Sequence, residues 1–132
     1  MKPIKQEDDF GCGVACVASI LEIGYQSALS LFREGEKKSQ NTGFYCREIV
    51  EVLANQGLRY EYNYIKPKLR KRIYKEGEMV FLRRSKKYPE GHYLCRMGKR
   101  WMDPWLNFPV DKREAGFRQR LPEKPIYLLY PL

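Results

Sequence analysis

The feature that most constrains the fold is residues 12–23, CGVACVASILEI, where Glu22 is the only charged residue. A helix that is apolar on nearly every side has to be buried on most of them. We therefore expect a central helix with other elements packed around it, and Gly24 is placed to end it. The chain of 132 residues, 43% of them hydrophobic, is long enough to supply one core.

Two more helices are predicted in the first half. A short one covers residues 26–34, and its inward residues are Ala28, Leu29 and Phe32. Residues 41–45 form a loop. A third helix covers residues 46–56, with Gly57 as its C-terminal signal. Its expected inner face comprises Ile49, Val50, Leu53 and Ala54.

The second half has the patterns of strands. Residues 58–65 alternate and contain three tyrosines, and further strands are predicted at 79–83, 92–97, 100–104 and 126–130. Gly98-Lys99 is a plausible two-residue hairpin turn. Helices first and strands afterwards indicate an α+β fold, in which the helices pack on one side of an antiparallel sheet. With no repeat, low-complexity tract or linker, residues 1–132 are expected to form one domain.

Cys12 opens the buried helix and is a candidate nucleophile. The positive end of a helix dipole favours a thiolate over a thiol, and the thiolate is the form that attacks carbonyl groups. A lone cysteine at a helix start is more often only a small buried hydrophobe. The assignment of a reactive site therefore depends on what lies near Cys12.

The only histidine, His92, supplies a partner if Gly98-Lys99 forms the turn. Met97 then pairs with Arg100, and His92 and Asp103 become diagonal neighbours on one face, with Cα atoms roughly 7–8 Å apart. Cys95 points away from that face. An imidazole held by a carboxylate on one ring nitrogen can serve a nucleophile with the other. A slip of one residue would break this arrangement.

Other uses of these residues are less well supported. The spacing of Cys12 and Cys16 is loose for zinc, Cys46 and Cys95 are isolated, and structural zinc prefers two tight pairs. Four scattered cysteines do not suggest a disulfide scaffold. The formal charge of +9 suits a solvated surface, or attraction to nucleic acid, an anionic membrane or an acidic peptide. The basic runs 66–75 and 83–87 make no recognisable nucleic-acid signature.

Three motifs resemble those of the bacteriocin-processing peptidases, the papain-like domains of peptide-exporting ABC transporters that cleave leaders after a double glycine. They are Gln6-x5-Cys12-Gly-Val-Ala, Gly91-His92-Tyr-Leu, and Met102-Asp103-Pro104. The resemblance covers nearly the whole chain in the order of its elements. The first motif is fairly specific, whereas the other two are short.

The resemblance implies a role for each matching residue. Cys12 resembles the nucleophile, His92 the general base that becomes the general acid, and Asp103 the residue that orients His92. Gln6 resembles the side-chain donor of the oxyanion hole, which works with the backbone N–H of Cys12. The sequence departs from the family in three ways. Gly11 stands where the family usually has Asp, the hairpin is shorter, and no transporter domain is attached.

The sequence thus predicts a stand-alone papain-like cysteine peptidase that needs no cofactor and no metal. Its expected partner is a peptide or protein substrate, and the basic surface could recruit an anionic partner, although nucleic acid is not favoured. The polar N-terminus and the lack of a long apolar run predict a cytoplasmic protein without a transmembrane segment. A non-catalytic peptide-binding module, a basic nucleic-acid-binding domain and an acyl-transferring or deamidating enzyme remain alternatives.

Overall fold

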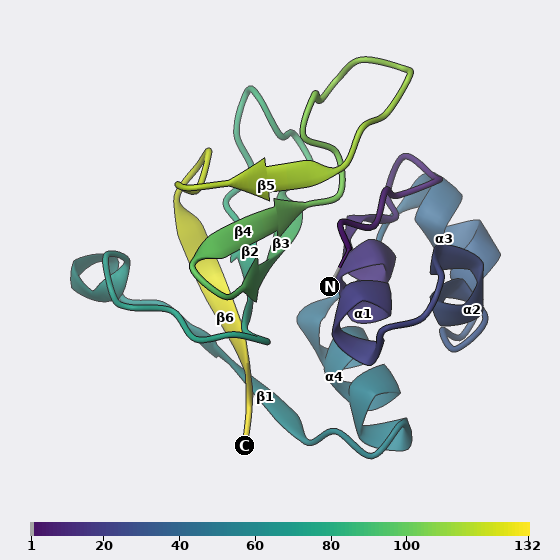
Figure 1. Cartoon of the computed structure of the whole chain (residues 1–132), viewed down its shortest axis with the longest axis horizontal. Coiled ribbons are helices and arrows are strands. Elements are labelled where there is room, and N and C mark those ends of the chain that lie inside the picture. The colour runs from purple at the N-terminus through teal and green to yellow at the C-terminus, as the bar shows by residue number, and fades with distance from the viewer. Residues whose placement is uncertain (1) are drawn as a thin grey trace.

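The computed structural model describes residues 2–132, which form a layer of helices against one face of an antiparallel sheet (Figure 1). The helices are α1 (Cys12–Leu21), α2 (Tyr25–Leu29), α3 (Gly35–Asn41) and α4 (Cys46–Asn55), and a short 3-10 helix, η1, spans Pro67–Leu69. The strands are β1 (Tyr60–Tyr64), β2 (Met79–Leu82), β3 (His92–Met97), β4 (Arg100–Asp103), β5 (Gly116–Arg118) and β6 (Pro125–Pro131). The predicted α+β fold is confirmed.

Helix α1 is the central buried helix that its composition predicts, since every residue from Gly13 to Ser19 is buried. It ends earlier than expected. Glu22 takes the left-handed conformation with φ 57°, and the N–H of Ile23 donates to the carbonyl of Ala18. The prediction that Gly24 ends the helix was therefore wrong. Gly24 instead precedes α2 as its N-cap residue.

The other helices match the prediction in part. Helix α2 stops at Leu29, although all three residues expected to face inward are buried. Helix α3 was not predicted, because its sequence GEKKSQN has no apolar residue to mark a buried face. In α4, Ala54 is exposed and Val52 is buried instead. Gly57 ends α4 as predicted, with φ +87°.

The sheet has the strand order β1-β6-β2-β3-β4-β5 within the described residues. The hairpin between β3 and β4 has the predicted register, with Met97 opposite Arg100 and Cys95 opposite Met102. Strand β5, which was not predicted, adds to β4 with Gly116 opposite Asp103. Strand β1 is correct in position but not in its alternation: only Tyr60 is buried, because β1 is an edge strand.

One hydrophobic cluster packs on each face of the sheet. The cluster on the helical side joins α1 to Tyr93, Cys95 and Met102, and the cluster on the other side contains Leu94 and Trp101. Because side chains alternate along a strand, His92 lies on the same face of the sheet as Leu94, and Cys95 lies on the other face, as predicted. In residues 2–132, no helix combines the length and apolar character needed to cross a membrane.

Candidate functional site

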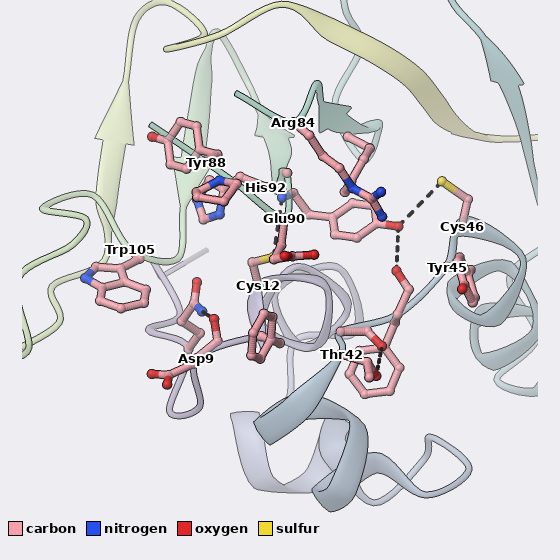
Figure 2. Close-up of a pocket in the computed structure, with 18 of the residues that line it drawn as sticks. Asp9, Cys12, Thr42, Tyr45, Cys46, Arg84, Tyr88, Glu90, His92 and Trp105 are labelled. Atoms are coloured by element: carbon pink, nitrogen blue, oxygen red, sulfur yellow. Dashed lines mark hydrogen bonds between the residues drawn. The ribbon is translucent and has the colours of Figure 1, made fainter. Parts of the chain in front are cut away.

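Cys12 is the first residue of α1 and lies against the start of β3. The backbone N–H of Tyr93 points at the Cys12 sulfur, 3.4 Å away (Figure 2). Glycines allow this close approach. A Cβ added to Gly13 would come within 3.0 Å of Ile49 and 3.3 Å of Tyr93. The half-exposed Cys12 thiol is therefore held at the junction of the helical layer and the sheet.

His92 and Asp103 form the pair that the hairpin register predicts. The distance from His92 Nε2 to Asp103 Oδ1 is 2.7 Å, and the two side chains are 4% and 0% exposed. Burial lowers the pKa of His92, but its interactions with Asp103 and Cys12 outweigh that effect and raise the pKa to about 9. Since Nε2 is engaged by Asp103, Nδ1 is the ring nitrogen left for the thiol.

Asp103 has two further partners that sequence reasoning missed. Arg118 Nε donates to Asp103 Oδ2 at 2.7 Å, and the backbone N–H of Trp105 donates to Oδ1 at 3.0 Å. Burial raises the pKa of Asp103, whereas the bonds from His92, Arg118 and Trp105 lower it to about 2. Asp103 is therefore a fully bonded carboxylate. Arg118 could have been found only by predicting β5.

Tyr88 stacks on the His92 imidazole. The ring centroids are 4.8 Å apart and the planes differ by 2°, and Tyr88 itself is buried. Phe108 packs beside both rings, with its centroid 5.1 Å from that of Tyr88 and 6.5 Å from that of His92. The imidazole therefore has little freedom to tilt. The spacing of four residues between Tyr88 and His92 matches no recognisable motif, so this contact could not be predicted from the sequence.

Gln6 is buried beside the site, but its amide is engaged. Its Nε2 donates to the carbonyl oxygens of Asp8 and Asp9 at 2.9 and 3.2 Å, while its buried Oε1 has no hydrogen-bond partner. The side chain thus lies near Cys12 in the lining of the same cleft. Its donor hydrogens are directed at the loop that precedes α1.

That loop is anchored to the helical layer through Asp8. The Asp8 carboxylate accepts from the hydroxyl of Tyr25 at 2.8 Å and from that of Ser39 at 3.1 Å. The Tyr25 hydroxyl occupies the space that a side chain at position 11 would need, since a Cβ on Gly11 would lie 1.9 Å from it. This packing explains why Gly11 precedes Cys12.

A cleft of about 1000 Å³ contains Cys12, His92 and Gln6 (Figure 2). In Figure 2, Asp9 and Trp105 flank Cys12 on one side, and Arg84, Tyr45 and Cys46 flank it on the other. The cleft therefore extends in both directions from the thiol, as a site for a chain molecule requires. Tyr93 forms part of its wall and donates through its hydroxyl to the carbonyl of Phe44.

All four cysteines are free thiols. Burial raises the pKa values of Cys16 and Cys46, and for Cys16 the neighbouring Cys95 adds to the effect. Within residues 2–132, no three His, Cys, Asp or Glu side chains gather in a way that could hold a metal ion. Cys12 therefore differs from the other three cysteines in being partly exposed and in interacting with the His92 imidazole.

The fold is that of known peptidase domains. The peptidase domain of Streptococcus ComA, a bifunctional ABC transporter involved in quorum sensing, superimposes with a TM-score of 0.61 at 19% identity, over 97% of this chain and 95% of that one. A double-glycine-motif protease from an AMS/PCAT transporter, solved in complex with its leader peptide, gives 0.58 at 15% identity, over 98% and 89%. The peptidase domain of Streptococcus mutans ComA gives 0.56 at 19% identity, over 100% and 99%.

These similarities are structural. No protein-family model matches the sequence, and the search of curated proteins returned no match. The chain therefore has the fold of the double-glycine peptidase domains, at a sequence identity too low to carry over their activity. What this chain does has to be argued from its own site.

Proposed function

We propose that residues 1–132 act as one papain-like cysteine peptidase domain, with Cys12 as the nucleophile. The observation that carries the proposal is that Cys12 and the hydrogen-bonded pair of His92 and Asp103 meet at one cleft, where Cys12 contributes to the raised pKa of His92. Each single residue has an ordinary structural explanation. A nucleophile, a base and a group that orients the base are what activation of a thiol requires, and these three residues are proposed to supply them.

The chemistry follows from the protonation states. With its pKa raised to about 9, His92 is protonated at neutral pH and can stabilise a Cys12 thiolate. The thiolate attacks the peptide carbonyl carbon, and His92 gives its proton to the departing amine as the C–N bond breaks. Water then attacks the thioester carbonyl carbon while His92 accepts a proton; the C–S bond breaks, which releases the acid and restores the Cys12 thiolate beside protonated His92. Asp103 keeps the imidazole oriented throughout.

The oxyanion hole is proposed to use the backbone N–H of Cys12 and the amide of Gln6. For Gln6 to donate to the oxyanion, its Nε2 has to give up one of its two hydrogen bonds to loop carbonyls. The bond to Asp9 is the longer and weaker of the two, so it is the one expected to break. A donor aimed at the oxyanion contributes roughly 2.7–4 kcal/mol. Gln6→Ala is then expected to lower kcat by about 10²–10³-fold.

The substrate is proposed to be a leader or precursor peptide that binds in an extended form along the cleft. The fold similarity to a protease solved with its leader peptide supports this class of substrate. The two-sided cleft supports it independently, because a peptide bond at Cys12 needs room for chain on both sides.

A non-catalytic peptide-binding module is the second candidate. The observation that favours it is the engaged amide of Gln6, which leaves the side-chain donor of the oxyanion hole turned toward Asp8 and Asp9. In that case Gln6→Ala would leave peptide binding unchanged and Cys12 would be unreactive.

The test is cleavage of a proteome-derived peptide library, read by mass spectrometry as newly formed termini. The peptidase proposal predicts cleavage products that are absent with Cys12→Ala and with His92→Ala. Cys16→Ala is the matched control, since Cys16 is buried within α1. Products that persist with Cys12→Ala would contradict the proposal, and capture of peptides without cleavage would favour the binding module.

A further inference from the structure

The connection between β1 and β2 carries an exposed cluster that the cleft does not use. We define the basic loop as residues 66–75, KPKLRKRIYK, which contains η1. In Figure 1 it projects from the left edge of the sheet, away from the helical layer that contains α1. It is thus a protruding surface, separate from the site at Cys12.

The basic loop combines positive charge with exposed apolar side chains. Its cations are Lys66, Lys68, Arg70, Lys71, Arg72 and Lys75. The carboxylate of Glu78 lies 3.7 Å from Arg72 and is the only one that forms a salt bridge with the loop among the described residues. Ile73 is 88% exposed and Leu69 is 51% exposed. A solvated surface accounts for the charges of the basic loop but not for its exposed Ile and Leu side chains.

The exposure of Ile73 is imposed by the fold. The neighbouring Tyr74 packs edge-on against the buried ring of Trp101, with centroids 4.9 Å apart, and its hydroxyl donates to the carbonyl of Arg70. With Tyr74 held against the sheet, the side chain of Ile73 is directed into solvent. The N–H of Arg72 also donates to the carbonyl of Leu69, which tightens the turn. The apolar side chains are therefore presented by an anchored loop.

We propose that the basic loop binds an anionic membrane surface, with Ile73 and Leu69 entering the interface and the surrounding cations contacting lipid headgroups. Cations near an anionic leaflet and apolar side chains inserted at the boundary are the two contributions that peripheral membrane binding combines. Nucleic acid offers the charge but no apolar phase for an isoleucine. The proposal is independent of the reactivity of Cys12.

The expected magnitudes come from the two contributions. Each Lys or Arg near an anionic surface contributes about fivefold to the binding constant, which is about 1 kcal/mol. Lys68→Glu with Lys71→Glu should therefore weaken binding by at least about 20-fold. Moving Leu69 and Ile73 into an apolar region favours binding by roughly tenfold or more for each side chain. Leu69→Ser with Ile73→Ser should weaken binding by about 100-fold.

The experiment is cosedimentation of the full chain with vesicles of phosphatidylcholine, with and without phosphatidylserine, at low and high NaCl. We expect binding only to the vesicles with phosphatidylserine, weakened by salt and by each double variant. The matched control is Arg33→Glu with Lys37→Glu, which reverses the same charge at exposed positions of the helical layer. It should bind nearly as well as the unchanged chain.

Single-stranded DNA serves as a soluble polyanion in parallel. The apolar double variant should lose affinity for vesicles and keep its affinity for DNA. The proposal is overturned if the chain does not bind anionic vesicles, or if the apolar variant binds them as tightly as the unchanged chain. Equal losses in the loop and control charge variants would also overturn it, because that result would mean nonspecific attraction to the net charge.

Discussion

Asp103→Asn is the substitution whose effect can be derived most fully from the site. His92 is buried and its pKa is nevertheless about 9 rather than 6.5, because Asp103 and Cys12 stabilise the imidazolium. At about 1.36 kcal/mol per pKa unit, this difference corresponds to about 3 kcal/mol in favour of the protonated form. Asparagine keeps the shape of the side chain and removes its charge. Cys12 alone then opposes the effect of burial, and the pKa of His92 should fall from about 9 toward 6.5.

The assay is an NMR titration of the imidazole C–H signals. His92 is the only histidine, so the signals need no assignment by mutation. Asp111→Asn, at an exposed carboxylate lining the same cleft, is the matched control and should leave the pKa of His92 unchanged. A pKa of 6.5 or lower in the unchanged chain, or a pKa that Asp103→Asn does not lower, would refute the reasoning.

The raised pKa of His92 also makes the stability of the fold depend on pH. Because the folded pKa of His92 is raised, its contribution is fully present below pH 6.5 and is lost as the pH rises through about 9. The free energy of unfolding should fall by up to about 3 kcal/mol across this window, a large fraction of the 5–15 kcal/mol typical of a domain. Urea unfolding on both sides of the window should show a smaller fall in Asp103→Asn. Other groups also titrate there, so the difference between the two chains is the quantity to compare.

Two further predictions concern the surroundings of the site. Arg118→Met removes a charge-assisted bond to Asp103 worth about 1.5–3 kcal/mol. Because the pKa of Asp103 is lowered in the folded chain, its contribution to stability is lost as the pH falls through about 2, and without Arg118 this loss should begin at higher pH. Thermal melting at a series of acidic pH values measures this, and an unchanged onset of acid unfolding would contradict the role of Arg118. Gly11→Ala places a Cβ 1.9 Å from the Tyr25 hydroxyl and should cost about 1–3 kcal/mol in urea unfolding. Adding Tyr25→Phe should recover part of that loss, and no recovery would show that the clash is not the cause.

The hairpin was predictable because local rules determine it. Gly98-Lys99 fixes the turn, and the alternation of side chains then brings His92 and Asp103 to one face. Helix α1 was predictable for a similar reason, since its composition leaves no polar side. Its end was not, because a left-handed Glu22 has no signal comparable to that of a glycine.

The missing elements lack hydrophobic patterns. Helix α3 has no apolar residue, and β5 is three residues long with no fully buried side chain. The omission of β5 is also why Arg118 was missed, since only the pairing of β4 with β5 brings it to Asp103. The orientation of the Gln6 amide depends on two backbone carbonyls in a loop, and such contacts require coordinates.

The measurement that tests the central claim most directly is the rate at which a low concentration of iodoacetamide alkylates each cysteine, read by mass spectrometry of digested peptides. It needs no knowledge of the substrate. Cys12 should react well before the buried Cys16, Cys46 and Cys95. Exposure alone could produce that order, so the rate must also be compared with that of Cys12 in the unfolded chain at a pH below the ordinary thiol pKa of about 8.5.

If His92 stabilises a thiolate at Cys12, the folded chain reacts faster than the unfolded chain at that pH, and His92→Ala removes the advantage. Cys12→Ser serves as the blank for the labelled peptide. Equal and slow labelling of all four cysteines, or a Cys12 rate that His92→Ala leaves unchanged, would contradict a cysteine peptidase built on Cys12, His92 and Asp103.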